Sequence, residues 1–243
     1  MAAKVHGCFE PPVDVNVKVW RYMDFTKFVS LLESESLYLA AADRFEDPYE
    51  GAMSHANELI TDDVDLPPEM REILSGFRQW GRSWTYINCW HMNAGESAAM
   101  WRLYAQTAEA VAIQSTYCKL RDCLPDSAYV GTVKYIDYDN TPIPQNNLFY
   151  PYVHKRLSFQ HEQEIRVLVQ ELPHVPGGGG LDRSRVTNDG GKMVKIDLTQ
   201  LIDEIYISPT APSWFFQLVT KLCRRYGYTF NVRQSNLART PIF

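Results

Sequence analysis

Residues 88–105 read Asn88-Cys-Trp-His-Met-Asn-Ala-Gly-Glu-Ser-Ala-Ala-Met-Trp-Arg-Leu-Tyr-Ala105, and this stretch sets the arrangement of the chain around it. The segment 84–90 that leads into it is dense in aromatic and β-branched residues, which favours a buried strand. Residues 93–95 predict a turn, since Asn and Gly are both common where a chain reverses. The residues after the turn gather large side chains on one side, which predicts a helix of about three turns.

Two polar side chains, His91 and Glu96, flank this predicted turn. A junction of strand and helix can be purely structural, or it can be the floor of a pocket, and the sequence leaves both open. Cys89 lies two residues before His91, so both side chains project from the same face of the strand. Such a pair could act as nucleophile and base, but a structural role is commoner for a buried Cys.

The length and composition of the chain set its domain organisation. It has 243 residues, of which 45% are hydrophobic, and this is enough to bury a large core. We predict a single domain over residues 1–243, with its core over about 17–235 and an acidic helical insertion over about 50–82. The insertion is predicted because this segment has no strand of its own, and it overlaps positions 43–72, which hold ten acidic residues against two basic ones.

Cysteine and charge patterns bear on the compartment and on the partners. Five cysteines without paired spacing predict free thiols in a reducing compartment. No apolar run approaches the roughly 18 residues that a membrane-spanning helix needs, so we expect a soluble, cytoplasmic protein with no membrane partner. The last thirty residues are basic, which is more often a solvated helix face than a nucleic-acid site. Nucleic-acid binding is therefore not strongly indicated.

Hydrophobic periodicity predicts strands and helices that do not strictly alternate along the chain. A strand is expected over 18–23, a helix capped by Asp24 follows it, and a second strand covers 37–40. Later in the chain the pattern predicts a strand, a helix and a strand over 129–138, 152–163 and 164–171. This mixture predicts an α+β fold, with a mixed, mainly antiparallel sheet and flanking helices.

The strongest polar constellation is His161-Glu-Gln-Glu-Ile-Arg166, which is followed by Val-Leu-Val. If a strand begins at Glu164, the side chains of Glu164 and Arg166 share one face. They could polarise a substrate hydroxyl or hold a ligand there, and an ion pair at the start of a strand is the equal alternative. Glu162 lies two residues from Glu164, and paired carboxylates can shift each other's pKa.

Arg21 and Tyr22 lie among apolar residues in the first predicted strand. A buried Arg costs desolvation free energy unless it pairs with an acid or meets an anion. We expect an acid such as Asp47 or Glu50 to pair with it, and an anionic ligand is the alternative. The loop that carries these two acids lacks the dense spacing of oxygen ligands in a calcium site, so no metal site is predicted.

Six short motifs stand out along residues 18–208. They are Trp20-Arg21-Tyr22, Leu37-Tyr38-Leu39, Phe45-Glu46-Asp47-Pro48-Tyr49-Glu50, Cys89-Trp90-His91-Met92-Asn93, Glu96-Ser97-Ala98-Ala99-Met100-Trp101 with Tyr104, and His161-Glu162-Gln163-Glu164-Ile165-Arg166. In this order they resemble a widespread family of uncharacterised bacterial and phage proteins, in which Asn usually stands at the position of Glu46. The resemblance implies an intracellular bacterial or phage protein and supplies no established activity.

The order of elements is also similar, more remotely, to that of the ADP-ribosyltransferases. These enzymes place Arg or His on a first strand to hold NAD, and a Glu on a later strand to stabilise an oxocarbenium-like transition state. The resemblance implies that Arg21 binds the phosphate or ribose of NAD, that Tyr38 stacks on nicotinamide and that Glu164 is catalytic. It implies an ADP-ribosyltransferase-like fold with NAD as substrate. The Ser-Thr-Ser element of the arginine-first class is missing from this chain.

Three hypotheses for the function follow. The first is a NAD-dependent ADP-ribosyltransferase-like enzyme, with a protein or nucleic-acid target and a role in conflict between phages and bacteria. The second is a non-catalytic module that binds a ligand or partner in an aromatic-lined groove. The third is a nuclease that holds a metal ion with Asp47, Glu50 and Glu164. The residues expected at the site, besides the catalytic Glu164, are Arg21, Tyr22, Tyr38, Asp47, Glu50, His91, Glu96, Trp101, Tyr104 and Arg166.

Overall fold

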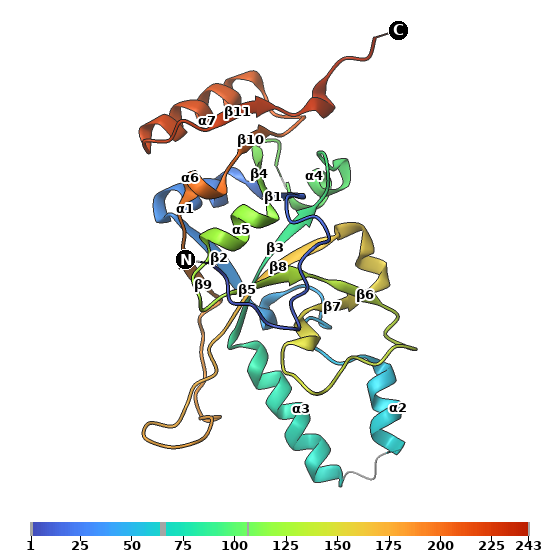
Figure 1. The fold of residues 1–243 in the computed structure, drawn as a ribbon. Helices are drawn as coiled ribbons and strands as arrows, with labels where there is room; N and C mark the ends of the chain where they lie inside the picture. The colour runs from blue at the N-terminus through green and yellow to red at the C-terminus, as the bar shows by residue number, and fades with distance from the viewer. Residues whose placement is uncertain (1, 64–66, 106, 243) are drawn as a thin grey trace.

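The computed structural model describes residues 2–63, 67–105 and 107–242, which form a large sheet surrounded by helices (Figure 1). The strands are β1 (Lys18–Asp24), β2 (Ser36–Ala41), β3 (Thr85–Met92), β4 (Ala110–Thr116), β5 (Tyr129–Thr132), β6 (Lys134–Ile136), β7 (His154–Arg156), β8 (Glu164–Gln170), β9 (Gly191–Lys195), β10 (Glu204–Ile207) and β11 (Asn231–Gln234). The helices are α1 (Phe25–Ser34), α2 (His55–Asp63), α3 (Pro68–Arg82), α4 (Ala98–Tyr104), α5 (Tyr117–Cys123), α6 (Leu198–Leu201) and α7 (Ser213–Arg225).

The main sheet has nine strands and is built mostly from antiparallel pairs. Seven of its strands follow the order β11-β10-β4-β1-β3-β2-β9, and β8 with its neighbour β5 lies on the other side of β3. Within this sheet β10 and β11 run parallel, whereas the remaining pairs are antiparallel. The predicted α+β class with a mainly antiparallel sheet and flanking helices is confirmed.

β3 is the strand at which the sheet divides. β8 pairs with one edge of β3 from Thr85 to His91. The other edge is shared, because β2 pairs with it at Tyr86 and Ile87 and β1 pairs with it at His91 and Met92. Between these contacts β1 and β2 diverge, β1 toward β4 and β2 toward β9. The sheet therefore opens along the middle of β3.

Apolar layers cover both faces of the sheet. A large cluster joins α1, α5, α6 and α7 to the sheet, with Phe28, Leu120 and Phe215 fully buried. A smaller cluster packs Met100 and Trp101 of α4 against Trp20 and other residues of β1, β4 and β10. Side chains alternate between faces along a strand, so these two clusters lie on opposite sides of β1. The stretch 88–105 thus provides both the central strand and a packing helix.

Local sequence signals account for several helix boundaries. The hydroxyl of Ser97 accepts a hydrogen bond from the N–H of Met100 at 3.3 Å and caps α4, which has seven residues rather than the three turns predicted. Pro68 opens α3 as predicted, because a helix needs no N–H donor at its first position. α2 and α3 lie at the end of the molecule opposite α7 (Figure 1).

Two predicted elements differ from the structure. The strand predicted over 129–138 is interrupted, because Lys134 donates its N–H to the carbonyl of Val153 at 2.8 Å and the chain leaves β8 for β7. The helix predicted over 152–163 is wrong, since this segment contains β7 and a 3₁₀ helix over Leu157–Glu162. The division into a core and an acidic insertion over 50–82 stays a prediction, and its positions 64–66 lie outside the described residues.

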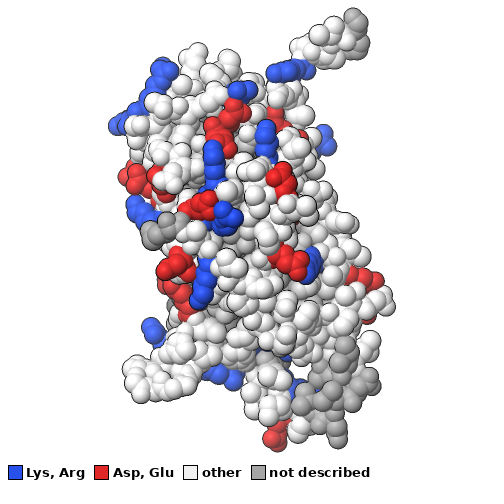
Figure 2. All heavy atoms as spheres, in the orientation of Figure 1, with Lys and Arg blue, Asp and Glu red and all other residues white. Residues whose placement is uncertain are grey.

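The surface charges are mixed in sign (Figure 2), and the cysteines are not joined by disulfide bonds. Figure 2 shows Lys and Arg interspersed with Asp and Glu on this face, rather than gathered into one region of a single charge. The five cysteines are free thiols, as predicted. None of the helices in the described part of the chain is long and apolar enough to cross a membrane.

Candidate functional site

A cavity of about 700 Å³ lies where the sheet divides. Its walls come from β1, β2, β3, the loop after β2, α4, and the segment from β7 to the start of β8. Eight of the residues predicted for the site line this one cavity: Arg21, Tyr22, Tyr38, Asp47, Glu50, His91, Tyr104 and Glu164. Arg21 and Glu164 are more than 140 residues apart in the sequence. Both reach this cavity because β1 and β8 each pair with β3.

Two side-chain hydrogen bonds hold the diverging strands around the cavity. Arg21 of β1 donates from Nη1 to the carbonyl of Cys89 at 2.8 Å. Asn88 donates from Nδ2 to the carbonyl of Tyr38 in β2, also at 2.8 Å. Both bonds satisfy backbone carbonyls near the point where the ladder hydrogen bonds stop, and a buried carbonyl left without a donor is costly.

Arg21 is a cation without an acidic partner in the described part of the chain. The two acids expected to pair with it do not, because Asp47 pairs with Arg156 and Glu50 pairs with Arg166. Burial lowers the pKa of the Arg21 guanidinium, yet an Arg side chain stays protonated in proteins. Its charge and its remaining N–H donors therefore face the cavity with one backbone carbonyl as their hydrogen-bond acceptor.

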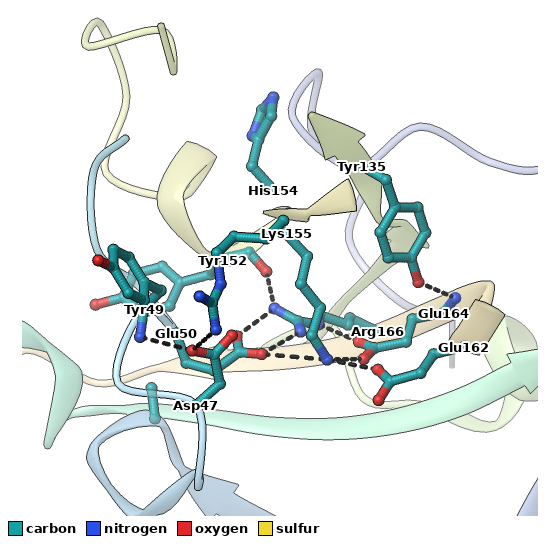
Figure 3. Close-up of polar contacts among 12 residues, drawn as sticks. Asp47, Tyr49, Glu50, Tyr135, Tyr152, His154, Lys155, Glu162, Glu164 and Arg166 are labelled. Carbon is teal, nitrogen blue, oxygen red and sulfur yellow. Dashed lines mark hydrogen bonds and ion pairs between the residues drawn. The ribbon is translucent and has the colours of Figure 1, made fainter. Parts of the chain in front are cut away.

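Beside the cavity lies a group of five buried charged residues, here named the buried charge cluster (Figure 3). Its members are Glu50, Lys155, Glu162, Glu164 and Arg166. Arg166 has no exposed surface; it donates to both carboxylate oxygens of Glu50 at 2.8 Å and, from Nε, to Glu164 at 2.5 Å. Arg166 does not line the cavity, but it contacts the carboxylates of Glu50 and Glu164, which do.

Lys155 links the three carboxylates of this cluster. Its ammonium lies 2.5 Å from Glu162, 2.7 Å from Glu164 and 3.5 Å from Glu50. Sequence analysis did not find Lys155, because its segment was predicted as a helix and its charge was not connected to the acids seven and nine residues later. The signal that could have found it is an excess of acids, because Glu162 and Glu164 adjoin a buried strand that carries one cation, Arg166.

The two neighbouring carboxyl groups have different proton affinities. Burial, together with the hydrogen bond and charge of Glu164, raises the pKa of Glu162 to about 7. Burial also disfavours the charge on Glu164, but Arg166, the hydrogen bond from Glu162 and Lys155 outweigh it and lower the pKa of Glu164. Near neutral pH, Glu164 is therefore ionised while Glu162 exchanges a proton.

The loop after β2 supplies Asp47 and Glu50 in fixed orientations. Asp47 accepts hydrogen bonds from Nη2 of Arg156 at 2.8 Å and from the N–H of Tyr49 at 3.1 Å. The loop passes through Gly51, whose φ of +73° is a conformation that suits glycine. A Cβ at Gly51 would also collide with the ring of Tyr152, so the close approach requires glycine there.

Polar side chains from β1, β3 and α4 complete the wall opposite the loop. His91 contacts the carbonyl of Glu162 through Nδ1 at 2.6 Å, and burial lowers the pKa of its imidazole. Tyr104 donates its hydroxyl to Glu162 at 3.3 Å. The hydroxyl of Tyr22 accepts the N–H of Ser97 at 2.9 Å, which fixes this ring at the start of α4.

Tyr38 forms an aromatic rim of the cavity. Its side chain is exposed, and its ring lies against the backbone of Gly191 in β9, where a Cβ would collide with the ring. The paired strands β2 and β9 therefore hold the ring in place, because Tyr38 faces Met193 in register and Gly191 lies two pairs along, on the same face of the sheet. A fixed aromatic face at the mouth of a cavity suits a planar ligand group.

Besides Arg166, two of the predicted site residues, Glu96 and Trp101, lie outside the cavity. Glu96 accepts hydrogen bonds from the indole of Trp101 at 3.1 Å and from the N–H of Asn236 at 2.8 Å. Trp101 itself is buried in the cluster beneath α4. Cys89 does line the cavity, but burial raises its pKa, so it is a thiol rather than a nucleophilic thiolate.

Comparisons with known proteins identify no family for this chain. No family model matches it, and no curated protein matches it. Among solved structures, it is similar to DarT from Thermus sp. 2.9 in complex with NAD+, with 10% sequence identity and a TM-score of 0.43. The alignment covers 95% of this chain and 100% of that chain. At this TM-score the likeness alone does not establish a common fold, so a function has to be argued from the residues of the cavity.

Proposed function

We propose that the cavity binds NAD and that this protein is an ADP-ribosyltransferase-like enzyme, which transfers ADP-ribose from NAD to an acceptor. The observation that carries the proposal is a guanidinium with no acidic partner among the described residues, together with a buried set of carboxylates, on the walls of one cavity. Arg21 supplies the guanidinium, and the buried charge cluster supplies the carboxylates. The cavity volume of about 700 Å³ lies inside the range of about 300–1,000 Å³ that is usual for ligand pockets.

The charges of the cavity complement those of NAD at two points. The pyrophosphate of NAD is an anion, and a guanidinium binds phosphate oxygens through paired hydrogen bonds. The nicotinamide ring of NAD is a cation. The buried charge cluster holds three carboxyl groups and two cationic side chains, so it gains one net negative charge as Glu162 ionises, with a pKa of about 7. This surplus favours a cationic ring beside Glu164.

The proposed reaction takes place at the anomeric carbon of the ribose that carries nicotinamide. The bond from C1′ to the nicotinamide nitrogen breaks, and its electron pair leaves with neutral nicotinamide. Glu164, held ionised by the cations beside it, stabilises the oxocarbenium-like charge that develops on the ribose. The acceptor then bonds to C1′ and gives its proton to Glu162, whose pKa of about 7 suits a general base at neutral pH.

Label transfer tests the proposal. Purified full-length protein would be incubated with cell lysate or nucleic acid and with NAD labelled in its adenine half, and released nicotinamide would be measured in parallel. We expect labelled macromolecule and nicotinamide from the wild type and neither from Glu164→Gln. Glu171→Gln is the matched control, because Glu171 follows the same strand and pairs with Lys192 at the surface. A wild type that gives neither product contradicts the proposal.

A second candidate, binding without catalysis, is favoured by the aromatic walls of the cavity. Trp20, Tyr22, Trp90 and Tyr104 line it together with Tyr38. Saturable binding of NAD with no nicotinamide release would support this alternative. The nuclease hypothesis has less support, because Asp47, Glu50 and Glu164 each already pair with Arg or Lys, which a metal ion would have to displace.

The biological role proposed with this activity is conflict between phages and bacteria. Expression of the wild type in bacteria would then slow growth, because ADP-ribosylation of a cellular target removes its function. Glu164→Gln would relieve the effect at equal protein level. Equal growth with both proteins would contradict this role and leave the enzymatic proposal to the label-transfer assay.

A further inference from the structure

His91 makes one hydrogen bond within the described residues, and that bond goes to the backbone that carries Glu162. Nδ1 lies 2.6 Å from the carbonyl oxygen of Glu162. A carbonyl oxygen only accepts, so the proton of the neutral imidazole is on Nδ1. Nε2 is buried and has no partner in the described part of the chain. Within the described residues, the imidazole of His91 therefore makes its hydrogen bond to the carbonyl of Glu162.

The next carbonyl along the chain is held by the next residue of β3. Met92 donates its N–H to the carbonyl of Gln163 at 2.9 Å. Two consecutive residues at the end of β3 thus fix two consecutive peptide carbonyls, at the corner where the 3₁₀ helix meets β8. The pairing of His91 with Glu164 in register places this corner directly beside the imidazole.

The corner has an uncommon backbone conformation at Gln163. Its φ of 39° and ψ of 59° are left-handed, which is uncommon for a residue other than glycine. Because of this reversal, Glu162 is not part of β8, yet its carboxyl meets the same ammonium of Lys155 as the carboxyl of Glu164 does. The direction of the Glu162 side chain therefore depends on the corner being held in this conformation.

We propose that His91 is a positioning residue, which holds the Glu162–Gln163 corner so that the Glu162 carboxyl stays buried between Lys155, Glu164 and Tyr104. The positioning stands on the geometry of the corner, whereas the use of Glu162 as a base rests on the proposed function. Removing the donor of a hydrogen bond to a buried carbonyl leaves that carbonyl unsatisfied, which is costly. Loss of the donor would free the corner and let the carboxyl move toward cavity water.

The charged and titratable groups near Glu162 come from several elements. They are His91 of β3, Tyr104 of α4, Lys155 of β7, Glu164 and Arg166 of β8, Glu50 of the loop after β2, and His161, which immediately precedes Glu162. Burial contributes most to the raised pKa of Glu162. Movement of the carboxyl into water therefore lowers that pKa toward the ordinary value of about 4.3.

Carbon-13 NMR titration of the glutamate carboxyl groups tests this role without requiring any activity. The Glu162 resonance is assigned by its absence in Glu162→Gln, and the wild type is expected to titrate with a midpoint of about 7. His91→Leu should move this midpoint down by about one pH unit or more, since it removes the donor. His91→Asn should keep it near 7, because the Asn amide places an N–H donor close to the position of Nδ1.

His154→Leu is the matched control for general destabilisation. His154 is equally buried, and its Nδ1 contacts the carbonyl of Tyr150 at 2.7 Å, but it does not line the cavity. The midpoint of Glu162 should stay near 7 in this variant. An unchanged midpoint in folded His91→Leu, or an equal shift in His154→Leu, overturns the proposal.

Gln163 offers a second test in case His91→Leu does not fold. Gln163→Gly keeps access to the left-handed conformation, and the Glu162 midpoint should be unchanged. Gln163→Val disfavours that conformation, and the midpoint should fall as it does in His91→Leu. The same midpoint in both variants overturns the proposal. The titration is independent of NAD turnover, so failure of the proposed enzymatic function would leave its result interpretable.

Discussion

Arg21 and Arg166 have opposite environments, although both lie at the same site: Arg166 is fully buried and Arg21 is partly buried. Arg166 is surrounded by acceptors, with Glu50, Glu164 and the carbonyl of Tyr152 all within 2.8 Å. Arg21 has one backbone acceptor and faces the cavity. A cation whose hydrogen-bonding capacity is filled by the protein stabilises the fold, whereas one with unused donors at a cavity is available to a ligand.

The two arginines should therefore differ in their effect on stability. Arg166→Met removes the partner of two buried carboxylates, and we expect the free energy of unfolding to fall by about 3–5 kcal/mol. Arg21→Met loses one hydrogen bond to a carbonyl, and we expect a loss of about 1 kcal/mol. Urea unfolding followed by circular dichroism measures both values. Equal losses in the two variants would contradict the separation of roles.

Glu162 should set the acidic limb of the pH–rate profile. The base is the ionised carboxylate, so its fraction and the rate rise with pH, with a midpoint of about 7 and a plateau above it. Glu162→Gln should lose this limb and lower the rate about 10²- to 10⁴-fold. Nicotinamide release measured from pH 5 to 9 provides the profile. A limb that persists in Glu162→Gln would assign the base to another group.

At the level of single residues, the sequence predicted which side chains come together better than it predicted their partners. Arg21, Tyr38 and Glu164 were selected from short motifs, and the structure places them on one cavity. The expected pairing of Arg21 with Asp47 or Glu50 was wrong, because ion pairs depend on contacts between distant segments. Lys155 was missed for the same reason, since its partners lie across a backbone corner that periodicity does not reveal.

At the level of elements, the division of the sheet at β3 creates the cavity. The sequence predicted strands over 18–23, 37–40 and 84–90, and all three are present as β1, β2 and β3. It gave no indication that β1 and β2 share one edge of β3, because strand order depends on long-range pairing. The hydrogen bond from Asn88 to the carbonyl of Tyr38 marks the β2 side of this division.

The loop that carries Asp47 and Glu50 provides a prediction at this scale. Gly51→Ala should destabilise the protein more than Gly177→Ala, although both glycines have positive φ values, +73° and +69°. An added Cβ meets open space at Gly177, so only backbone strain of about 1–2 kcal/mol applies there. At Gly51 it collides with the ring of Tyr152, and overpacking adds about 1–3 kcal/mol. Thermal unfolding compares the two variants, and equal losses would contradict this account of the loop.

At the level of the whole molecule, composition and periodicity predicted the α+β class and the mainly antiparallel sheet. The enrichment of a segment in residues that favour strands is a local property, and most of the strands predicted from it are present. The helix predicted over 152–163 was wrong, because pairing of β7 with β6 overrode local propensity. That error concealed the segment from which Lys155 and Glu162 approach Glu164, and with it the buried charge cluster.

The whole molecule also explains how a cavity with charged groups on its walls persists beside a large core. β3 is paired on both edges at its ends, so the opening at its centre is framed by sheet rather than by loops. Clusters of packed side chains on both faces hold this frame. A site framed by rigid elements can keep an unpaired cation and a set of buried carboxylates facing a ligand.

Calorimetric titration of NAD into the purified full-length protein tests the central claim most directly. We predict saturable binding to the wild type and binding about 10- to 100-fold weaker to Arg21→Met, because a hydrogen bond to a charged group contributes about 1.5–3 kcal/mol. Arg78→Met is the matched control, since Arg78 is a half-buried arginine that does not line the cavity. It should bind as the wild type does. No binding to the wild type, or equal affinity of the wild type and Arg21→Met, would contradict the account.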